Sequence, residues 1–333
     1  DFRSDRFKNS ICDLKGNNDL LSLTRPDIIK EIHKQYLKAG ADIIETNTFS
    51  STSIAQSDYD LQTVVYDINF ESARIAKEAA NEFSTNSKPR FVAGAIGPTN
   101  RTSSISPDVE NPAFRNITFD QLKVSYAEQV GALIDGGVDI LLVETVFDTL
   151  NCKAALFAIL DIFEKRNITL PIMVSGTITD ESGRTLSGQT CEAFLNSISH
   201  VPLLSVGINC ALGTDAMRPY IKELSDKSST NICAFPNAGL PNEMGLYDQT
   251  SKIMADQLND FMNSGLVNIV GGCCGTTPDH IKEISRVAKN CKPRVIPSLE
   301  NVMTLSGLEA VTISKVSNFV NIGERTNVTG SAK

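Results

Sequence analysis

Two adjacent cysteines stand among glycines in the stretch NIVGGCCGTTPDH, residues 268–280, just before a helix-start signal. A third cysteine, Cys210, ends the apolar stretch LLSVGINC. Zinc favours tetrahedral coordination, so Cys210, Cys273 and Cys274 would supply three thiolates and leave the fourth position open, which is typical of catalytic zinc. Such a site carries negative charge and suits a soft ligand. We therefore expect it to hold a substrate thiol deprotonated at neutral pH.

Neighbouring residues of a regular strand point to opposite faces, so Cys273 and Cys274 reach one metal only if the backbone bends. Gly271, Gly272 and Gly275 permit such a bend. The alternative interpretation is that both cysteines are small buried residues, because free cysteine is among the most buried residue types. The remaining cysteines are interpreted as core or surface residues: Cys12, Cys152, Cys191, Cys233 and Cys291. The histidines fall on or near predicted helices and are interpreted as structural: His33, His200 and His280.

Other polar residues also follow apolar stretches. Glu144 follows the apolar stretch ILLV, and a buried carboxylate is costly unless paired. It is therefore a candidate for binding a substrate ammonium, with a hydrogen-bonded structural glutamate as the alternative. Asn237 in PNAGLP and Asn47 in ETNTF are either turn residues or ligands for the polar end of a substrate, and they would also offer zinc an oxygen ligand. The long polar loops 97–114 and 176–190 either close over a ligand or are solvated.

The elements that must position these residues alternate between short apolar runs and amphipathic stretches. Seven runs are predicted to be strands, each followed by a predicted helix: 41–49, 91–97, 139–145, 171–179, 203–210, 231–237 and 267–274. Another helix is predicted at 26–39, and Thr118, Thr190, Thr214 and Thr277 are predicted helix caps. This alternation indicates α/β architecture with a parallel sheet. A (βα)₈ TIM barrel needs one more strand, which we expect to precede Asp1. A doubly wound open sheet is the competing architecture, but neither GxGxxG nor a Walker pattern is present.

In a βα barrel, the active site is built at the carboxyl ends of the strands. The polar residues at those ends come from five different predicted strands: Asn47, Glu144, Cys210, Asn237 and the pair Cys273–Cys274. Glu45 and Thr46 lie at the same rim. The barrel would bring all of them to one mouth. The sequence therefore predicts a single site that combines metal ligands with substrate contacts.

Composition excludes several classes of protein. The chain has 333 residues, a hydrophobic fraction of 41% and a net charge of −8. No basic stripe with interleaved aromatics is present, so nucleic acid is not an expected partner. No apolar run approaches the roughly 18 residues of a membrane span. The irregularly spaced cysteines, without a signal peptide, indicate a reducing compartment, and we expect a cytoplasmic location.

We predict three segments along the chain. Residues 1–290 form the barrel, which we expect to be a fragment truncated at its N-terminus. Residues 291–316 are interpreted as a linker, because they hold two prolines, few large apolar residues and no clear period. Residues 317–333 begin another domain.

Seven motifs together resemble the homocysteine S-methyltransferase family. In order through residues 40–278 they are GADIIETNTF, GPTNRTSSISPDV, ETVFDTLN, SGTITDESGRTLSGQT, GINCALG, PNAGLP and GGCCGTTP. The match is greatest to the N-terminal module of cobalamin-dependent methionine synthases. The tail VNIGERTNVTGS is similar to the start of their pterin-binding domain, so 317–333 would begin that domain. The family opens with a strand bearing an Asp-Gly-Gly/Ala-Met-Gly motif, which is not in this chain and agrees with a lost first strand.

The resemblance implies a (βα)₈ barrel in which Cys210, Cys273 and Cys274 bind Zn²⁺. Homocysteine would bind through its sulfur, with Glu144 at its ammonium and Asn237 near both zinc and substrate. Methylcobalamin, held by another module of a longer chain, would donate the methyl group, giving methionine. The alternatives are a methyltransferase using betaine or S-methylmethionine, a non-catalytic barrel with structural zinc, and a thiol-redox protein. The last has no CxxC motif to support it.

Overall fold

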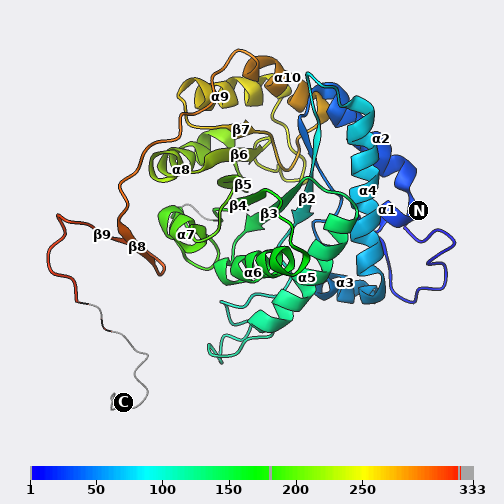
Figure 1. The fold of residues 1–333 in the computed structure, drawn as a ribbon. Coiled ribbons are helices and arrows are strands. Elements are labelled where there is room, and N and C mark those ends of the chain that lie inside the picture. Colours follow the sequence, from blue (N-terminus) through cyan, green and yellow to red (C-terminus); the bar gives the residue numbers. More distant parts are fainter. Residues whose placement is uncertain (1, 180–181, 322, 324–333) are drawn as a thin grey trace.

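Seven short apolar segments pair side by side into one parallel sheet, in the order in which they occur along the chain. The structure is a computed structural model that describes residues 2–179, 182–321 and 323. Figure 1 shows the sheet at the centre of the molecule with the helices around it. The strands are β1 (Ile43–Glu45), β2 (Phe91–Ile96), β3 (Ile140–Val146), β4 (Ile172–Gly176), β5 (Ser205–Gly213), β6 (Asn231–Asn237) and β7 (Ile269–Val270).

Helical segments precede β1, connect consecutive strands, as parallel pairing requires, and follow β7. They are α1 (Leu21–Thr24), α2 (Pro26–Ala39), α3 (Ser53–Gln56), η1 (Ser57–Tyr59), η2 (Gln62–Val64), α4 (Val65–Phe83), α5 (Phe119–Asp135), α6 (Thr149–Arg166), α7 (Cys191–Ile198), α8 (Thr214–Lys227), α9 (Ser251–Asn263) and α10 (Pro278–Ala288). No helix in the described part of the chain is long and apolar enough to cross a membrane.

Several helix starts follow the predicted capping chemistry. Thr118 and Gln121 form a capping box at α5, and the Thr190 side chain caps α7. Thr277 is the N-cap residue of α10. The prediction for Thr214 is wrong, because Gly213 is the N-cap residue of α8 and Thr214 is its first residue. The reason is that β5 extends to Gly213, beyond its predicted end at residue 210, and the helix begins immediately afterwards.

The sheet curls until its two edges approach each other. The Tyr36 hydroxyl of α2 donates a hydrogen bond to the Thr276 carbonyl, 2.8 Å away in the turn before α10. Gly40, at the end of α2, has no room for a Cβ, which would lie 2.5 Å from the Ser285 hydroxyl of α10. Within the described residues, no strand pairs with the outer edge of β1 or β7. The fold is a seven-stranded, TIM-barrel-like sheet, so the predicted fold class and strand count are confirmed.

Two apolar layers hold the sheet. The larger lies between the strands and the helices, where Leu141 and Val143 are buried. The smaller lies on the inner face and contains only strand residues, among them Ile140 and Leu142. Because side chains alternate along a strand, Glu144 also faces inward from β3. Ile43 packs against the same inner layer, so Glu45 also faces inward from β1. Both carboxylates therefore lie above the inner apolar layer, towards the carboxyl ends of the strands.

The edge strands are shorter than predicted. The strand prediction for 267–274 is wrong beyond Ile269–Val270, and that for 41–49 is wrong outside Ile43–Glu45. Each edge strand has one pairing neighbour, so fewer ladder hydrogen bonds hold it extended. After β7, residues 271–277 leave the strand as a turn.

The segment 291–316 contains regular structure that its sequence did not predict. Strands β8 (Met303–Ser306) and β9 (Ala310–Ile313) form an antiparallel hairpin beside α7 (Figure 1). The Ser306 hydroxyl donates to the Ala193 carbonyl of α7 at 2.6 Å. Of the proposed next domain, residues 317–321 and 323 belong to no helix or strand, and the rest of 317–333 lies outside the described residues.

Candidate functional site

The sulfur atoms of Cys210, Cys273 and Cys274 all lie within 4.8 Å of one another. The Sγ atoms of Cys210 and Cys274 are 3.6 Å apart, and those of Cys273 and Cys274 are 4.0 Å apart. Two sulfurs bound tetrahedrally to one zinc ion at about 2.3 Å stand about 3.8 Å apart. The structure therefore brings the three cysteines together at a spacing that fits zinc, and all eight cysteines of the chain are free thiols.

A bulge in β5 turns Cys210 towards the other two thiols. The pairing of β5 with β6 shifts register between Asn209 and Gly213. Within this bulge Cys210 has φ +62° and Ala211 has φ +56°, a left-handed conformation that non-glycine residues adopt rarely. Such strain, about 1–3 kcal/mol per residue, persists only where surrounding contacts impose it and is concentrated at functional sites.

The end of β6 holds the paired cysteines in place. The Cys273 amide donates to the Pro236 carbonyl at 2.8 Å, and the Cys274 amide donates to the Asn237 side-chain oxygen at 3.1 Å. Gly275 follows with φ +78°, and a Cβ there would lie 2.4 Å from the Tyr247 Cβ. The glycine-dependent bend predicted from the sequence therefore occurs, and it lets two neighbouring residues direct both sulfurs to one point.

Each of the three thiols shifts the pKa values of its neighbours. Hydrogen bonds from Cys210 and Cys273 lower the pKa of Cys274 well below its usual range. Hydrogen bonds with Cys210 and Cys274, followed by burial, raise the pKa of Cys273 far above it. No hydrogen bond joins these sulfurs to a lysine, arginine or histidine of the described residues. Three thiolates at this spacing would repel one another, and a metal cation would neutralise their charge.

A group of carboxylates lies near the thiols. Glu144 is 8% exposed, and burial, followed by the charges of Glu45, Asp19 and Cys274, raises its pKa well above the usual value. Protein atoms around the Glu45 carboxylate displace water from it and raise its pKa to about 7, although part of the residue remains exposed to solvent. Among the described residues, neither Glu45 nor Glu144 has a hydrogen-bond or ion-pair partner. Unpaired carboxylates in such surroundings favour a cationic ligand.

Asp19 joins this group from the N-terminal segment. Its Oδ2 accepts hydrogen bonds from the Ser50 amide at 2.7 Å and from the Ser51 hydroxyl at 2.8 Å. Burial raises the pKa of Asp19 to about 6, while the bonds from Ser51 and Ser50 act in the opposite direction. Asp19 carries no signal in the sequence, because it precedes a four-residue helix and follows no predicted strand.

The two predicted asparagines occupy different positions. Asn237 is 2% exposed and contacts the cysteine turn through its bond to Cys274. Asn47 instead donates to the Asn18 carbonyl at 2.8 Å and to the Ser22 hydroxyl at 3.2 Å. The structure therefore brings Asn237 to the thiols, whereas Asn47 is bonded to the N-terminal segment.

Two further residues near the thiols were not predicted. Tyr247, in the loop between β6 and α9, lies against the cysteine turn, because a Cβ on Gly275 would lie 2.4 Å from the Tyr247 Cβ. Asn209 lies directly before Cys210 in β5 and is 1% exposed. The sequence does contain a signal for Asn209, which is an asparagine within an apolar stretch. A buried side-chain amide needs several hydrogen-bond partners, so such a residue marks a polar contact.

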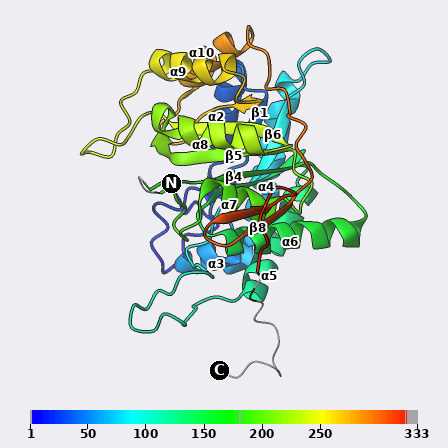
Figure 2. The same ribbon diagram turned by 90° about the vertical axis from the view of Figure 1, so that its left-hand side faces the viewer.

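The long polar loops project from the face where the site lies. In Figure 2, the teal loop 97–114 and the yellow loop 238–250 extend on the same side of the molecule, and each follows the carboxyl end of a strand. Ser104 anchors the first loop, because its hydroxyl donates to Asp148 at 2.6 Å. In the loop 176–190, residues 180–181 lie outside the described part, and the Thr190 amide donates to the Leu308 carbonyl of the hairpin at 3.0 Å.

The histidines have structural positions. The Thr277 amide donates to His280 Nδ1 at 3.2 Å, so Nε2 carries the proton and donates to the Gln249 carbonyl at 2.9 Å. Burial lowers the pKa of His33 to about 4, which keeps this helix residue neutral. His200 lies just beyond the end of α7.

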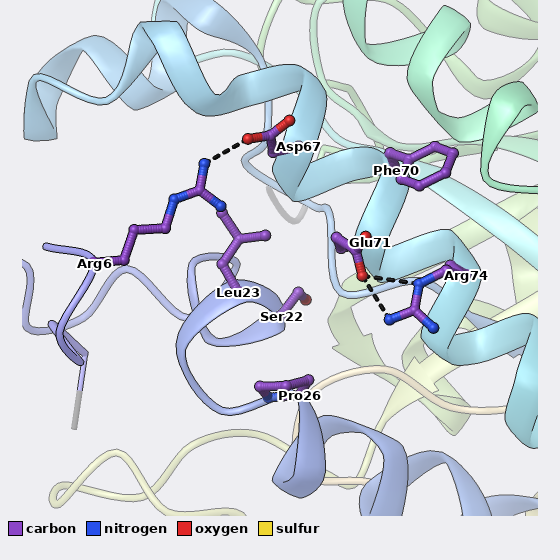
Figure 3. Close-up of a pocket in the computed structure, with 8 residues that line it drawn as sticks. All are labelled: Arg6, Ser22, Leu23, Pro26, Asp67, Phe70, Glu71 and Arg74. Carbon is purple, nitrogen blue, oxygen red and sulfur yellow. Dashed lines mark hydrogen bonds and ion pairs between the residues drawn. The ribbon is translucent and has the colours of Figure 1, made fainter.

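A separate pocket of about 330 Å³ lies against α1 and α4 (Figure 3). Its charged side chains are paired with each other, Arg6 with Asp67 and Arg74 with Glu71. None of its lining residues belongs to the thiol or carboxylate groups. We therefore assign the candidate chemistry to the thiols.

The chain is similar to known proteins in sequence and in structure. A family model described as homocysteine S-methyltransferase matches residues 3–288. The homocysteine methyltransferase MmuM from Escherichia coli, in its oxidized form, has a similar structure, with 20% identity and a TM-score of 0.67, covering 83% of this chain and 90% of that one. Its metallated form matches at 19% identity with a TM-score of 0.65, covering 83% and 90%. At these identities the structural likeness is evidence for the fold.

Proposed function

Because the chain belongs to the homocysteine S-methyltransferase family, we propose that it transfers a methyl group to the sulfur of homocysteine and forms methionine. The observation that carries this proposal is the spacing of three sulfurs, 3.6 Å and 4.0 Å for two of the three pairs, in a site with unpaired carboxylates. Cys210, Cys273 and Cys274 would hold zinc and leave one position for the substrate. Zinc there would keep the homocysteine thiol deprotonated at neutral pH.

The residues around the thiols would orient the amino acid. Glu144 is buried and without a partner, so it would accept hydrogen bonds from the homocysteine ammonium. Asn237 accepts the hydrogen bond from the Cys274 amide and would also contact the substrate beside the zinc. With both ends of homocysteine held, its sulfur faces a methyl donor arriving at the mouth. The new sulfur–carbon bond forms as the bond between the methyl group and its donor breaks, and the donor keeps the electron pair.

We further propose that the donor is methylcobalamin, bound by another module of a longer chain. The support is the motif set of residues 40–278 and the tail VNIGERTNVTGS, which resembles the start of a pterin-binding domain. The barrel would then be residues 1–290, followed by the connecting segment 291–316. The free thiols of all eight cysteines suit a reducing compartment such as the cytoplasm. The competing donors are betaine and S-methylmethionine.

A donor assay tests this function. Zinc-loaded protein and homocysteine are incubated with methylcobalamin, S-methylmethionine or betaine, and methionine is measured. We expect methionine with methylcobalamin, and its loss in Cys273→Ser. Cys291→Ser is the matched control, because its thiol follows the end of α10, contacts Asn259 of α9 and is not part of the cluster. If methionine formed only with S-methylmethionine or betaine, that compound would be the donor instead of methylcobalamin. Zinc binding without methionine from any donor would favour structural zinc, and full activity in Cys273→Ser would overturn the mechanism.

A further inference from the structure

Asn209 connects three strands at the level of the thiols. Its side-chain oxygen accepts hydrogen bonds from the Thr145 amide at 2.9 Å and from the Ser175 hydroxyl at 2.7 Å. Its side-chain nitrogen donates to the Thr145 hydroxyl at 2.7 Å and lies 3.8 Å from the sulfur of Cys273. The amide therefore contacts β3, β4 and the turn after β7 while its own backbone belongs to β5.

The orientation of this amide follows from its partners. A backbone N–H only donates, so the Thr145 amide must face the Asn209 oxygen. The NH₂ group is then on the other side, towards the Thr145 hydroxyl and the Cys273 sulfur. Rotating the amide by 180° would turn its NH₂ group towards the Thr145 backbone N–H, so that two donors would face each other. The N–H···S contact is thus required by the rest of the network.

Unusual backbone conformations flank the asparagine. Thr145 has φ +54° and Cys210 has φ +62°, both in the left-handed region. Thr145 follows the proposed ammonium ligand Glu144, and Cys210 is a proposed zinc ligand. The Asn209 side chain bonds Thr145 at both its amide and its hydroxyl, so one residue joins the end of β3 to two of the three cysteines.

We propose that Asn209 is a positioning residue, whose amide donates a hydrogen bond to the Cys273 thiolate and sets the distance between the zinc thiolates and Glu144. The proposal rests on the zinc site of the proposed function and assigns a role to a residue beside it. A donor to sulfur spreads the negative charge of a three-thiolate site. The partners of metal ligands orient them, and their loss typically lowers metal affinity about 10- to 100-fold.

Zinc competition with a chromophoric chelator tests this role. Asn209→Asp keeps the shape and the acceptor oxygen but removes the donor, and Asn209→Ala removes both. We expect zinc affinity to fall at least about tenfold in each. Ser175→Ala is the matched control, because it removes a hydrogen bond to Asn209 without touching the sulfur. A purely structural asparagine would lower thermal stability in all three variants while zinc affinity stayed within about twofold of the unsubstituted chain.

A second measurement needs no variant. In the ¹¹³Cd-substituted, ¹⁵N-labelled chain, a hydrogen bond to a ligating sulfur transmits scalar coupling from the metal to the amide proton. We expect such coupling to a side-chain proton of Asn209. Absence of this coupling, or unchanged zinc affinity in folded Asn209 variants, would overturn the proposal. A chain that binds neither zinc nor cadmium would overturn both proposals. Metal-to-proton coupling at Asn209 in a chain that transfers no methyl group would overturn the proposed function but support the role of Asn209.

Discussion

The backbone amide of Cys274 donates a hydrogen bond to the side chain of Asn237 at 3.1 Å, so the last residue of β6 fixes a turn that follows β7. The Ala238 amide donates back to the Cys274 carbonyl at 2.9 Å. β7 itself has only two strand residues. The end of β6, rather than β7, therefore holds the thiol pair in position.

The turn after the cysteines depends on Gly275. Gly275→Ala would place a Cβ 2.4 Å from Tyr247 at φ +78°, so we expect a loss of roughly 2–4 kcal/mol in unfolding free energy and weaker zinc binding. Gly265→Ala is the control, because Gly265 has φ +65° with no atom within 4 Å of the added Cβ. It should cost only about 1–2 kcal/mol and leave zinc binding unchanged. Denaturant unfolding and zinc titration measure both effects, and equal behaviour of the two variants would contradict this account.

Glu144 is proposed to bind the ammonium of homocysteine. Glu144→Gln removes the charge and keeps the shape, so we expect KM for homocysteine to rise about 10- to 100-fold, as the loss of a hydrogen bond to a charged group predicts. Zinc content should not change. Glu31→Gln, on the exposed side of α2, is the control and should match the unsubstituted chain. Steady-state kinetics at saturating methyl donor measure the effect, and an unchanged KM in Glu144→Gln would exclude the assigned contact.

Asp19 makes the stability of the metal-free chain depend on pH. Its pKa rises from 3.8 to about 6 on folding, so the folded state binds the proton more tightly than the unfolded state. The protonated Asp19 therefore adds to the free energy of unfolding below about pH 4. This contribution, roughly 3 kcal/mol at most, is lost as the pH rises through 6. In Asp19→Asn, the decrease in unfolding free energy from pH 4 to pH 8 should be smaller. Urea unfolding at the two pH values tests this, and identical pH profiles would contradict it.

The hairpin β8–β9 supports the loop before α7. Gln189 donates to the Gly307 carbonyl at 2.7 Å, and Arg184 pairs with Glu309. Ending the chain after residue 299 should therefore increase amide hydrogen exchange in residues 182–190. The loop 97–114, anchored by Ser104 to Asp148, is the internal control and should exchange as before. Unchanged exchange in 182–190 would show that the hairpin does not hold this loop.

The barrel class and the positions of its strands followed from hydrophobic pattern, because parallel strands buried on both faces are continuous apolar runs. Convergence of Glu144, Cys210 and the paired cysteines followed from the same topology, since carboxyl ends of parallel strands meet at one rim. Thr118 and Thr190 identified helix starts because capping is local chemistry.

What the sequence did not predict depends on tertiary contacts. Non-glycine residues at positive φ, such as Cys210 and Thr145, carry no local signal, so the bulge that turns Cys210 and extends β5 was missed. The role of Asn209 requires knowledge of which strands lie beside it. Asn47 lies two residues beyond β1, and its bonds depend on where the N-terminal segment packs.

X-ray absorption at the zinc edge, with and without homocysteine, tests the central claim most directly. Without homocysteine, we expect three sulfur neighbours from Cys210, Cys273 and Cys274 and one lighter atom. With homocysteine, we expect four sulfurs, because the substrate sulfur takes the open position. Zinc with the same ligands in both samples would contradict the account, because homocysteine would then not reach the metal on which its activation depends.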